Sequence, residues 1–187
     1  MSGSSSRLPV AIIGAGDAAP GSNAYRAAYE VGHGLARRGL IILCGGRSGV
    51  MEAACRGAGA AGGISIGILP HLDLAEANRF ASILLPTDLG SERDPICRDP
   101  NVSRNRVIAA AARCLVAVGG GIGTANEIRH ALTFNKIVFG ICGSPAPEAG
   151  TPAAPEARGS YMRLESPAAV IEHVLELIGS QKSASTA

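Results

Sequence analysis

The sequence predicts an α/β fold, a single Rossmann-like domain in which helices cover both faces of a doubly wound parallel sheet. Three observations carry this prediction. Short apolar runs alternate with helical patterns, these runs are apolar at every position, and glycines follow several of them. Strands that are apolar throughout are typical of a parallel sheet buried on both faces. Right-handed crossovers between such strands place helices on both sides.

Length and composition agree with one domain. The chain has 187 residues, of which 47% are hydrophobic and only 3% aromatic, and it contains 25 glycines. An aliphatic core of this kind favours α/β layering over an all-β sandwich. We place the domain at residues 8–179 and expect disordered tails at residues 1–7 and 180–187, which are short, polar or rich in small residues.

The first half of the domain holds four expected strands, at residues 9–13, 40–44, 64–69 and 82–85, and two expected helices, at residues 22–38 and 48–61. Ser22 is a suitable N-cap for the first helix, and Gly39 ends it. Gly62 closes the second helix. Pro70 and Pro86 stop the third and fourth strands, because proline has no backbone N–H to donate.

The second half holds expected helices at residues 103–113, 125–134 and 167–178 and expected strands at residues 114–118 and 136–142. Ser103 is a candidate N-cap, and Pro167 suits the first position of the closing helix. Residues 143–159 are rich in proline, alanine and glycine, which predicts a surface loop.

Three strands end in glycine-rich segments, at residues 14–17, 45–49 and 119–124. Ligands of an open parallel sheet bind beyond the carboxyl ends of its strands. Glycine lets backbone amides turn towards a ligand, and the following helix N-terminus favours an anion. The sequence therefore predicts a site for a phosphorylated small molecule, although a tight turn explains residues 14–16 equally well. The candidate binding residues are Gly14, Gly16, Asp17, Gly45, Gly46, Arg47, Ser48, Gly49, Gly119, Gly120, Gly121, Ile122, Gly123 and Thr124.

The first segment, Gly14 to Ala19, fits the dinucleotide fingerprint G-x-G-x-x-G/A. That fingerprint also needs an acidic residue at the end of the second strand, where this chain has Cys44 followed by glycines, so we disfavour a nicotinamide dinucleotide. The P-loop pattern is absent from the sequence. Two roles stay open: Asp17 contacts a ribose hydroxyl or caps a turn, and Thr124 donates to phosphate, caps its helix, or does both.

Charge and cysteine usage exclude other classes. The net charge is +2 with scattered basic residues, so we expect no nucleic acid partner. No run reaches about 18 apolar residues, so we expect no membrane partner. The five cysteines are odd in number and lack C-x-x-C spacing, and the four histidines form no ligand pattern. We therefore expect a reduced, cytoplasmic protein that binds no metal directly.

Several motifs resemble those of a known family. Residues 120–127 (GGIGTANE) resemble the PGGxGTxxE signature of the Lonely Guy (LOG) family, long mislabelled as lysine decarboxylases. Residues 45–51 (GGRSGVM) resemble its second glycine loop, and Arg104 stands where the family carries an arginine. The resemblance runs from about residue 9 to 142. Residues 67–70 (GILP) and 86–90 (PTDLG) are most similar to a small branch of the SLOG superfamily that resembles molybdenum-cofactor carrier proteins.

The resemblance implies an activity and its residues. LOG enzymes hydrolyse the N-glycosidic bond of nucleoside 5′-monophosphates to base and ribose 5-phosphate, without a redox or metal cofactor. Glu127, expected in the first turn of its helix, would stabilise charge on the ribose or activate water. Arg104 would bind phosphate or orient ribose. The alternatives are that Glu127 only complements the helix N-terminus and that Arg104 is a solvated arginine.

Departures from the family pattern favour binding over hydrolysis. Gly119 replaces the family's proline, Asn105 its lysine, and Asn126 a second glutamate of many LOG enzymes. The alternative function is therefore a non-catalytic carrier or sensor, with the molybdenum cofactor, a phosphorylated pterin, as cargo. Residues 91–101 resemble an insertion that forms a lid, an oligomer contact or a plain polar loop. The resemblance also implies a homodimer or homotetramer.

Overall fold

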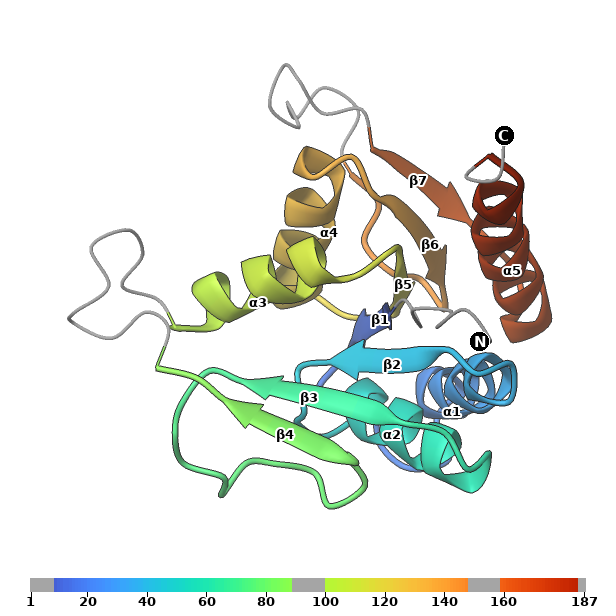
Figure 1. Ribbon diagram of the computed structural model, residues 1–187. Coiled ribbons are helices and arrows are strands. Elements are labelled where there is room, and N and C mark those ends of the chain that lie inside the picture. Colours follow the sequence, from blue (N-terminus) through green and yellow to red (C-terminus); the bar gives the residue numbers. More distant parts are fainter. Residues whose placement is uncertain (1–8, 89–99, 148–158, 185–187) are drawn as a thin grey trace, which may run out of the picture.

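Figure 1 shows the computed structural model, which describes residues 9–88, 100–147 and 159–184. Over these residues the strands are β1 (Pro9–Gly14), β2 (Ile41–Cys44), β3 (Ser65–Leu69), β4 (Ile83–Pro86), β5 (Leu115–Val118), β6 (Ile137–Ile141) and β7 (Ser160–Arg163). The helices are α1 (Asn23–Ala36), α2 (Val50–Ala60), α3 (Pro100–Ala111), α4 (Ile122–Thr133) and α5 (Pro167–Ala184).

All the described strands form one parallel sheet in the order β4-β3-β2-β1-β5-β6-β7. The chain winds outward from β1 to β4 in one direction and from β5 to β7 in the other. The topological switch point therefore lies between β1 and β5, where crossovers on opposite faces leave a crevice. The prediction of a doubly wound, Rossmann-like α/β domain is confirmed.

Alternate side chains of β1 pack into two separate hydrophobic cores, one on each face of the sheet. Val10 and Ile12 pack with the apolar faces of α1, α2 and α5. Ala11 and Ile13 pack with α3 and α4 on the other face of the sheet. Since both sets are nearly fully buried, the continuous apolar run of the sequence is explained by a strand covered on both sides. Figure 1 shows α5 and α1 on one side of the sheet and α3 and α4 on the other.

Some expected boundaries are correct and others are not. Ser22 caps α1, since its hydroxyl accepts a hydrogen bond of 3.2 Å from the amide of Tyr25. Ser103 is not an N-cap, because α3 already begins at Pro100. Helix α4 begins at Ile122 instead of residue 125, so the end of the third glycine segment forms its first turn.

The structure describes part of the expected C-terminal tail but none of the expected N-terminal tail. Helix α5 begins at Pro167 as expected, but it runs to Ala184, so the tail expected from residue 180 is wrong over residues 180–184. This extension follows from the absence of a glycine or proline stop after Ser180. The expected tail at residues 1–7, the end at residues 185–187 and residues 91–99 of the suspected insertion lie outside the described residues.

Strand β7 was not expected from the sequence. Ser160 to Arg163 pair with β6 in parallel, Ile137 opposite Ser160, although the four residues carry little apolar character. As an edge strand β7 has one covered side only, so the apolar signal of a central strand is missing. A strand thus follows the expected loop at residues 143–159, of which residues 148–158 lie outside the described residues.

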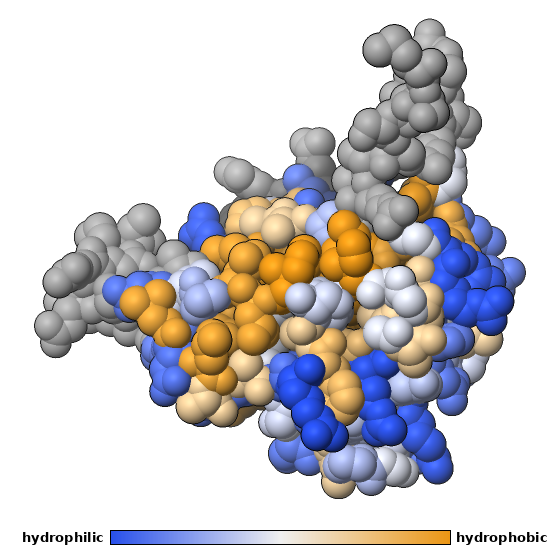
Figure 2. Space-filling model, turned by 60° about the horizontal axis from the view of Figure 1, so that its bottom comes forward, coloured by the Kyte–Doolittle hydropathy of each residue, from blue (hydrophilic) through white to orange (hydrophobic). Residues whose placement is uncertain are grey.

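The opposite edge of the sheet carries exposed apolar side chains. Ile83 and Leu85 of β4 are each 44% exposed, and Leu72 and Leu74 of the preceding segment are also exposed. Figure 2 shows the side of the molecule on which β4 lies, with hydrophobic residues gathered in a band. Among the described residues, no helix is long and apolar enough to span a membrane.

Candidate functional site

An open cleft of about 450 Å³ lies beyond the carboxyl ends of β1, β2 and β5, at the switch point of the sheet. Its lining comes from the segments that follow these strands and from the start of α3. The lining residues are Gly14, Ala15, Gly16, Asp17, Arg47, Ser48, Met51, Asn101, Arg104, Asn105, Gly121, Gly123 and Thr124. The three glycine-rich segments are thus brought together at one place.

The first two segments are joined by direct contacts. The hydroxyl of Ser48 donates a hydrogen bond of 2.8 Å to the carbonyl of Gly16, and the amide of Val50 donates one of 3.0 Å to the carbonyl of Ala15. Gly49 has φ +68°, and a Cβ there would lie 2.3 Å from the carbonyl oxygen of Ala15. Glycine is therefore needed at this position to let the two segments touch.

Glycines of the first and third segments are needed for a similar reason. A Cβ on Gly14 would lie 2.1 Å from the carbonyl oxygen of Val118, where β1 and β5 run side by side. A Cβ on Gly120, which has φ +102°, would lie 2.1 Å from the hydroxyl oxygen of Thr124. Part of the glycine pattern thus makes room for the protein's own chain, while Gly121 and Gly123 face the cleft with free space around them.

The expected site residues divide into two groups. Those that line the cleft are Gly14, Gly16, Asp17, Arg47, Ser48, Arg104, Gly121, Gly123 and Thr124. Those that do not line it are Gly45, Gly46, Gly49, Gly119, Gly120, Ile122 and Glu127. Ile122 extends into solvent with 92% of its surface exposed, and the buried glycines of the second group shape the backbone.

Sequence reasoning missed other lining residues, namely Ala15, Met51, Asn101 and Asn105. Asn105 is buried, and its side chain accepts a hydrogen bond of 3.0 Å from Nε of Arg104. The signal that would have found it is its place beside Arg104 at the cleft end of α3. Met51 is found by its place in the first turn of α2, directly after the second glycine segment.

Arg104 is a buried arginine, so the alternative of a solvated side chain is wrong. Only 6% of its surface is exposed, and burial lowers the pKa of its guanidinium. Its Nη1 donates hydrogen bonds of 2.8 Å to the carbonyl of Gly45 and 3.0 Å to that of Ile68. The side chain therefore ties α3 to the ends of β2 and β3, and it also lines the cleft.

Glu127 is buried as well, with 8% of its surface exposed. Burial raises the pKa of its carboxyl to about 7, against the opposing effect of the positive charge on Arg104. Its expected place in the first helical turn is wrong, because α4 starts at Ile122 and Glu127 falls in the second turn. The carboxyl group thus gains little from the helix N-terminus, whose field fades after the first turn.

The remaining charges of the cleft are of both signs. Arg47 forms an ion pair of 2.5 Å with Glu76, and the exposed Asp17 contributes a carboxylate. Helices α2 and α4 both start at glycine N-caps, Gly49 and Gly121, which offer no side-chain hydrogen bond to the first amides. Backbone N–H groups at such helix starts favour an anionic ligand.

Cysteine and histidine form no metal centre in the part of the chain that is described. Cys44, Cys55, Cys114 and Cys142 are free thiols. Over residues 9–88, 100–147 and 159–184, no three histidine, cysteine or acidic side chains are close enough to hold an ion together.

A Rossmann-like domain with a glycine-lined cleft at its switch point defines a class of small-molecule-binding proteins. Within this class, the chain belongs to the SLOG cluster4 family, whose model matches residues 7–171. An uncharacterized protein of Archaeoglobus fulgidus is 39% identical over 135 residues, which are 72% of this chain and 80% of that protein.

Two solved structures are similar over nearly their whole length. The molybdenum cofactor binding protein of Rippkaea orientalis superposes with a TM-score of 0.76 at 28% identity, covering 94% of this chain and 99% of that one. The molybdenum cofactor carrier protein of Chlamydomonas reinhardtii superposes with a TM-score of 0.72 at 34% identity, covering 92% and 99%. The expected resemblance to the molybdenum-cofactor carrier branch of the SLOG proteins is confirmed.

Proposed function

We propose that the cleft binds a phosphorylated, nucleotide-like small molecule. Its phosphate lies against the backbone amides of Gly121, Gly123 and Thr124, at the start of α4. The hydroxyl of Thr124 and the charge of Arg47 add donors, and Arg104 adds a second positive charge behind the loops. Asp17 accepts hydrogen bonds from the uncharged end of the ligand, such as a pterin amino group or a ribose hydroxyl.

We further propose that the protein is a non-catalytic carrier whose cargo is the molybdenum cofactor, a phosphorylated pterin. The observation that carries this proposal is the whole-length similarity to two proteins described as binding or carrying that cofactor. The cleft has the matching chemistry, with amides for the phosphate and polar side chains, Asp17 and Asn105, for a pterin ring. A carrier only has to bind and release its cargo. The hydrogen bonds of Arg104 to the carbonyls of Gly45 and Ile68 are compatible with both steps.

Hydrolysis of a nucleoside 5′-monophosphate is a second candidate, supported by the carboxyl group of Glu127. A group with pKa about 7 suits proton transfer near neutral pH. In this reaction water attacks C1′, and the bond from C1′ to the base nitrogen breaks with its electron pair leaving on the nitrogen. Glu127 accepts the proton of the water and passes it to that nitrogen, which releases the neutral base. Two observations weigh against it: Glu127 is buried without lining the cleft, and Arg104 uses its donors on the protein's own carbonyls.

One purification tests both candidates. Protein prepared without oxygen is oxidised to convert bound pterin to its fluorescent form, and molybdenum is measured by mass spectrometry. The carrier proposal expects about one pterin per chain and no base released from AMP. Release of free base that stops in Glu127→Gln, with no pterin recovered, would replace carriage by hydrolysis.

A substitution in the cleft tests whether the ligand binds there. Gly121→Val fits the fold, since a Cβ there meets nothing within 4 Å, but its side chain fills the cleft. We expect it to lose the pterin, while Gly179→Val on α5 keeps it. Equal pterin in both variants would mean that the ligand binds elsewhere.

We also propose that the chain forms a homo-oligomer, a dimer or tetramer, through the β4 edge. Ile83 and Leu85 are exposed apolar residues on the outermost strand β4. Figure 2 shows a band of hydrophobic side chains on the side of the molecule where this strand lies. Covering an exposed apolar edge strand with a second copy of the chain is energetically favourable. Light scattering should report an oligomer that Ile83→Lys with Leu85→Lys converts to monomer; an unchanged mass would remove this edge as the interface.

A further inference from the structure

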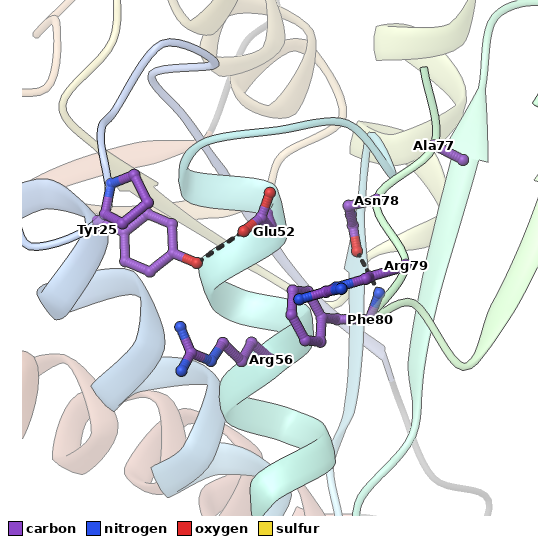
Figure 3. A pocket seen from close by; sticks show the side chains of 8 residues that line it. Tyr25, Glu52, Arg56, Ala77, Asn78, Arg79 and Phe80 are labelled. Carbon is purple, nitrogen blue, oxygen red and sulfur yellow. Dashed lines mark hydrogen bonds between the residues drawn. The ribbon is translucent and has the colours of Figure 1, made fainter. Parts of the chain in front are cut away.

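A second cavity, of about 630 Å³, opens between α1, α2 and the segment that leads into β4 (Figure 3). It shares no lining residue with the glycine-lined cleft. Its lining residues are Pro20, Tyr25, Glu52, Arg56, Ala77, Asn78, Arg79 and Phe80. Most of these residues are polar or charged, and Arg56 and Arg79 are exposed to solvent at its mouth.

Partly buried hydrogen bonds fix two walls of this cavity. Tyr25 is 5% exposed, and its hydroxyl donates a hydrogen bond of 2.9 Å to Oε1 of Glu52, as Figure 3 shows. Asn78 is 7% exposed, and its Oδ1 accepts hydrogen bonds of 3.0 Å from the amides of Phe80 and Ala81. The cavity is therefore preformed and needs no rearrangement to receive a ligand.

Two guanidinium groups converge on one aromatic ring. The Cζ atoms of Arg56 and Arg79 lie 5.8 Å and 5.0 Å from the centroid of Phe80. In the described part of the chain neither arginine has a carboxylate oxygen within 4.0 Å. Glu52 is placed one turn before Arg56, the ordinary spacing for an ion pair, but its Oε1 accepts the hydroxyl of Tyr25 instead.

This arrangement leaves an excess of positive charge inside a concave site. Two positive groups and one carboxylate line the cavity, and both guanidinium groups lie close to the ring of Phe80. Like charges that share one ring repel each other, so an anion between them relieves the repulsion and gains hydrogen bonds to both. The free oxygen of Glu52 can accept a hydrogen bond from the same ligand.

We propose that this cavity is a second binding site, for a small ligand that carries an oxyanion and a hydrogen-bond donor. The oxyanion, a phosphate or a carboxylate, lies between Arg56 and Arg79. The donor, a hydroxyl or amino group, faces Glu52. The rings of Tyr25 and Phe80 border the uncharged part of the ligand.

The second site is connected to the glycine-lined cleft through Asn78. The amide of Asn78 donates a hydrogen bond of 2.8 Å to the carbonyl of Gly46, and its Nδ2 donates one of 3.0 Å to the carbonyl of Arg47. A ligand that binds against Asn78 therefore also stabilises the hydrogen bonds that hold the second glycine segment. Occupancy of one site is expected to raise affinity at the other, since coupling between sites is reciprocal.

Equilibrium dialysis with radiolabelled inorganic phosphate, and separately with labelled acetate, tests the proposal. We expect the wild-type chain to bind two phosphates at saturation, one in each site. The double variant Arg56→Gln with Arg79→Gln should bind one, with affinity at the lost site at least tenfold lower. The matched control, Arg129→Gln with Arg163→Gln, removes the same charge from exposed positions on α4 and β7 and should keep two.

The same dialysis measurements distinguish phosphate from acetate and one site from the other. Gly121→Val should bind one phosphate at saturation, in the second site and with lower affinity than in the wild type, so failure of the glycine-lined cleft leaves the second site measurable. Loss of acetate but not phosphate in the arginine variant would assign the site to carboxylates. The single variant Arg79→Gln, in an exposed segment, guards against misfolding of the double variant. Unchanged binding of both anions in the arginine variants would overturn the proposal.

Discussion

Nη1 of Arg104 donates a hydrogen bond of 2.8 Å to the carbonyl of Gly45, although the two residues are 59 positions apart in the chain. A second bond from the same atom reaches Ile68 at the end of β3. The arginine that the LOG-like pattern suggests as a ligand anchor thus holds the second glycine segment in place. Its first role is to position backbone, and any contact with ligand is made from that fixed position.

Replacing Arg104 by lysine should therefore destabilise the fold. Lysine keeps the charge but cannot reproduce the planar set of donors, so the carbonyl of Gly45 or Ile68 loses its partner inside the protein. We expect a loss of about 1–3 kcal/mol in the free energy of unfolding, measured with urea. The control Arg129→Lys, at an exposed position of α4, should change it by less than about 0.5 kcal/mol. Equal stability of both variants would contradict the positioning role.

The buried carboxyl of Glu127 should make stability depend on pH. Its pKa is about 7 in the folded protein and lower in the unfolded chain, so the folded state holds more protons between these values. Stability is therefore greatest below about pH 4.5 for this group and falls as the pH rises to about 7. Above that pH the charged form costs about 3 kcal/mol.

Glu127→Gln removes this dependence. The variant should be more stable than the wild type at pH 8 by up to about 3 kcal/mol, with the difference disappearing towards pH 5. Urea unfolding of both proteins at several pH values measures it. A constant difference across this range, or a wild type that gains stability as the pH rises, would show that Glu127 is not buried as described.

Two neighbouring glycines should respond in opposite ways to alanine. Gly120→Ala places a methyl group against the side chain of Thr124 at φ +102°, which should cost about 1–3 kcal/mol. Gly123→Ala lies in α4 with free space around it and should stabilise the helix by about 0.5–1 kcal/mol. Thermal unfolding measures both. Loss of stability of the same size in both variants would contradict the packing described for this segment.

Removing Glu76 should strengthen the binding of anions in the cleft. Its carboxylate forms an ion pair with Arg47, a lining residue, and both side chains are partly exposed. Glu76→Gln releases Arg47 for the ligand, and we expect two- to fivefold tighter binding of inorganic phosphate, weakening as salt is added. Glu172→Gln, exposed on α5, is the control. A fall in affinity would mean that Glu76 holds Arg47 in its binding position.

The sequence was sufficient for the fold where local patterns and topology agree. Apolar runs such as residues 114–118 predict buried parallel strands, and the carboxyl ends of such strands must share one edge of the sheet. The convergence of the glycine segments follows from that rule. Strand β7 was not predictable in this way, because Ser160 to Arg163 are held by pairing with β6 and by little apolar burial.

The finer features of the site depend on contacts between distant segments. The hydrogen-bond partners of Arg104 lie at the ends of two strands distant in the sequence, and no sequence pattern predicts these contacts. The start of α4 at Ile122 was missed because glycine has a low helix propensity. In the structure Gly121 is the N-cap of α4 and Gly123 lies in its first turn, beside the cleft. Glu127 consequently moves from the first turn into the buried second turn, which changes its pKa and its availability to a ligand.

Phosphate binding at the meeting point of the glycine segments is best tested by a crystal structure with a phosphorylated pterin or a nucleoside monophosphate bound. We expect electron density for the phosphate within hydrogen-bonding distance of the amides of Gly123 and Thr124. A ligand whose phosphate lies outside this cleft, in a structure with the cleft unobstructed, would contradict it.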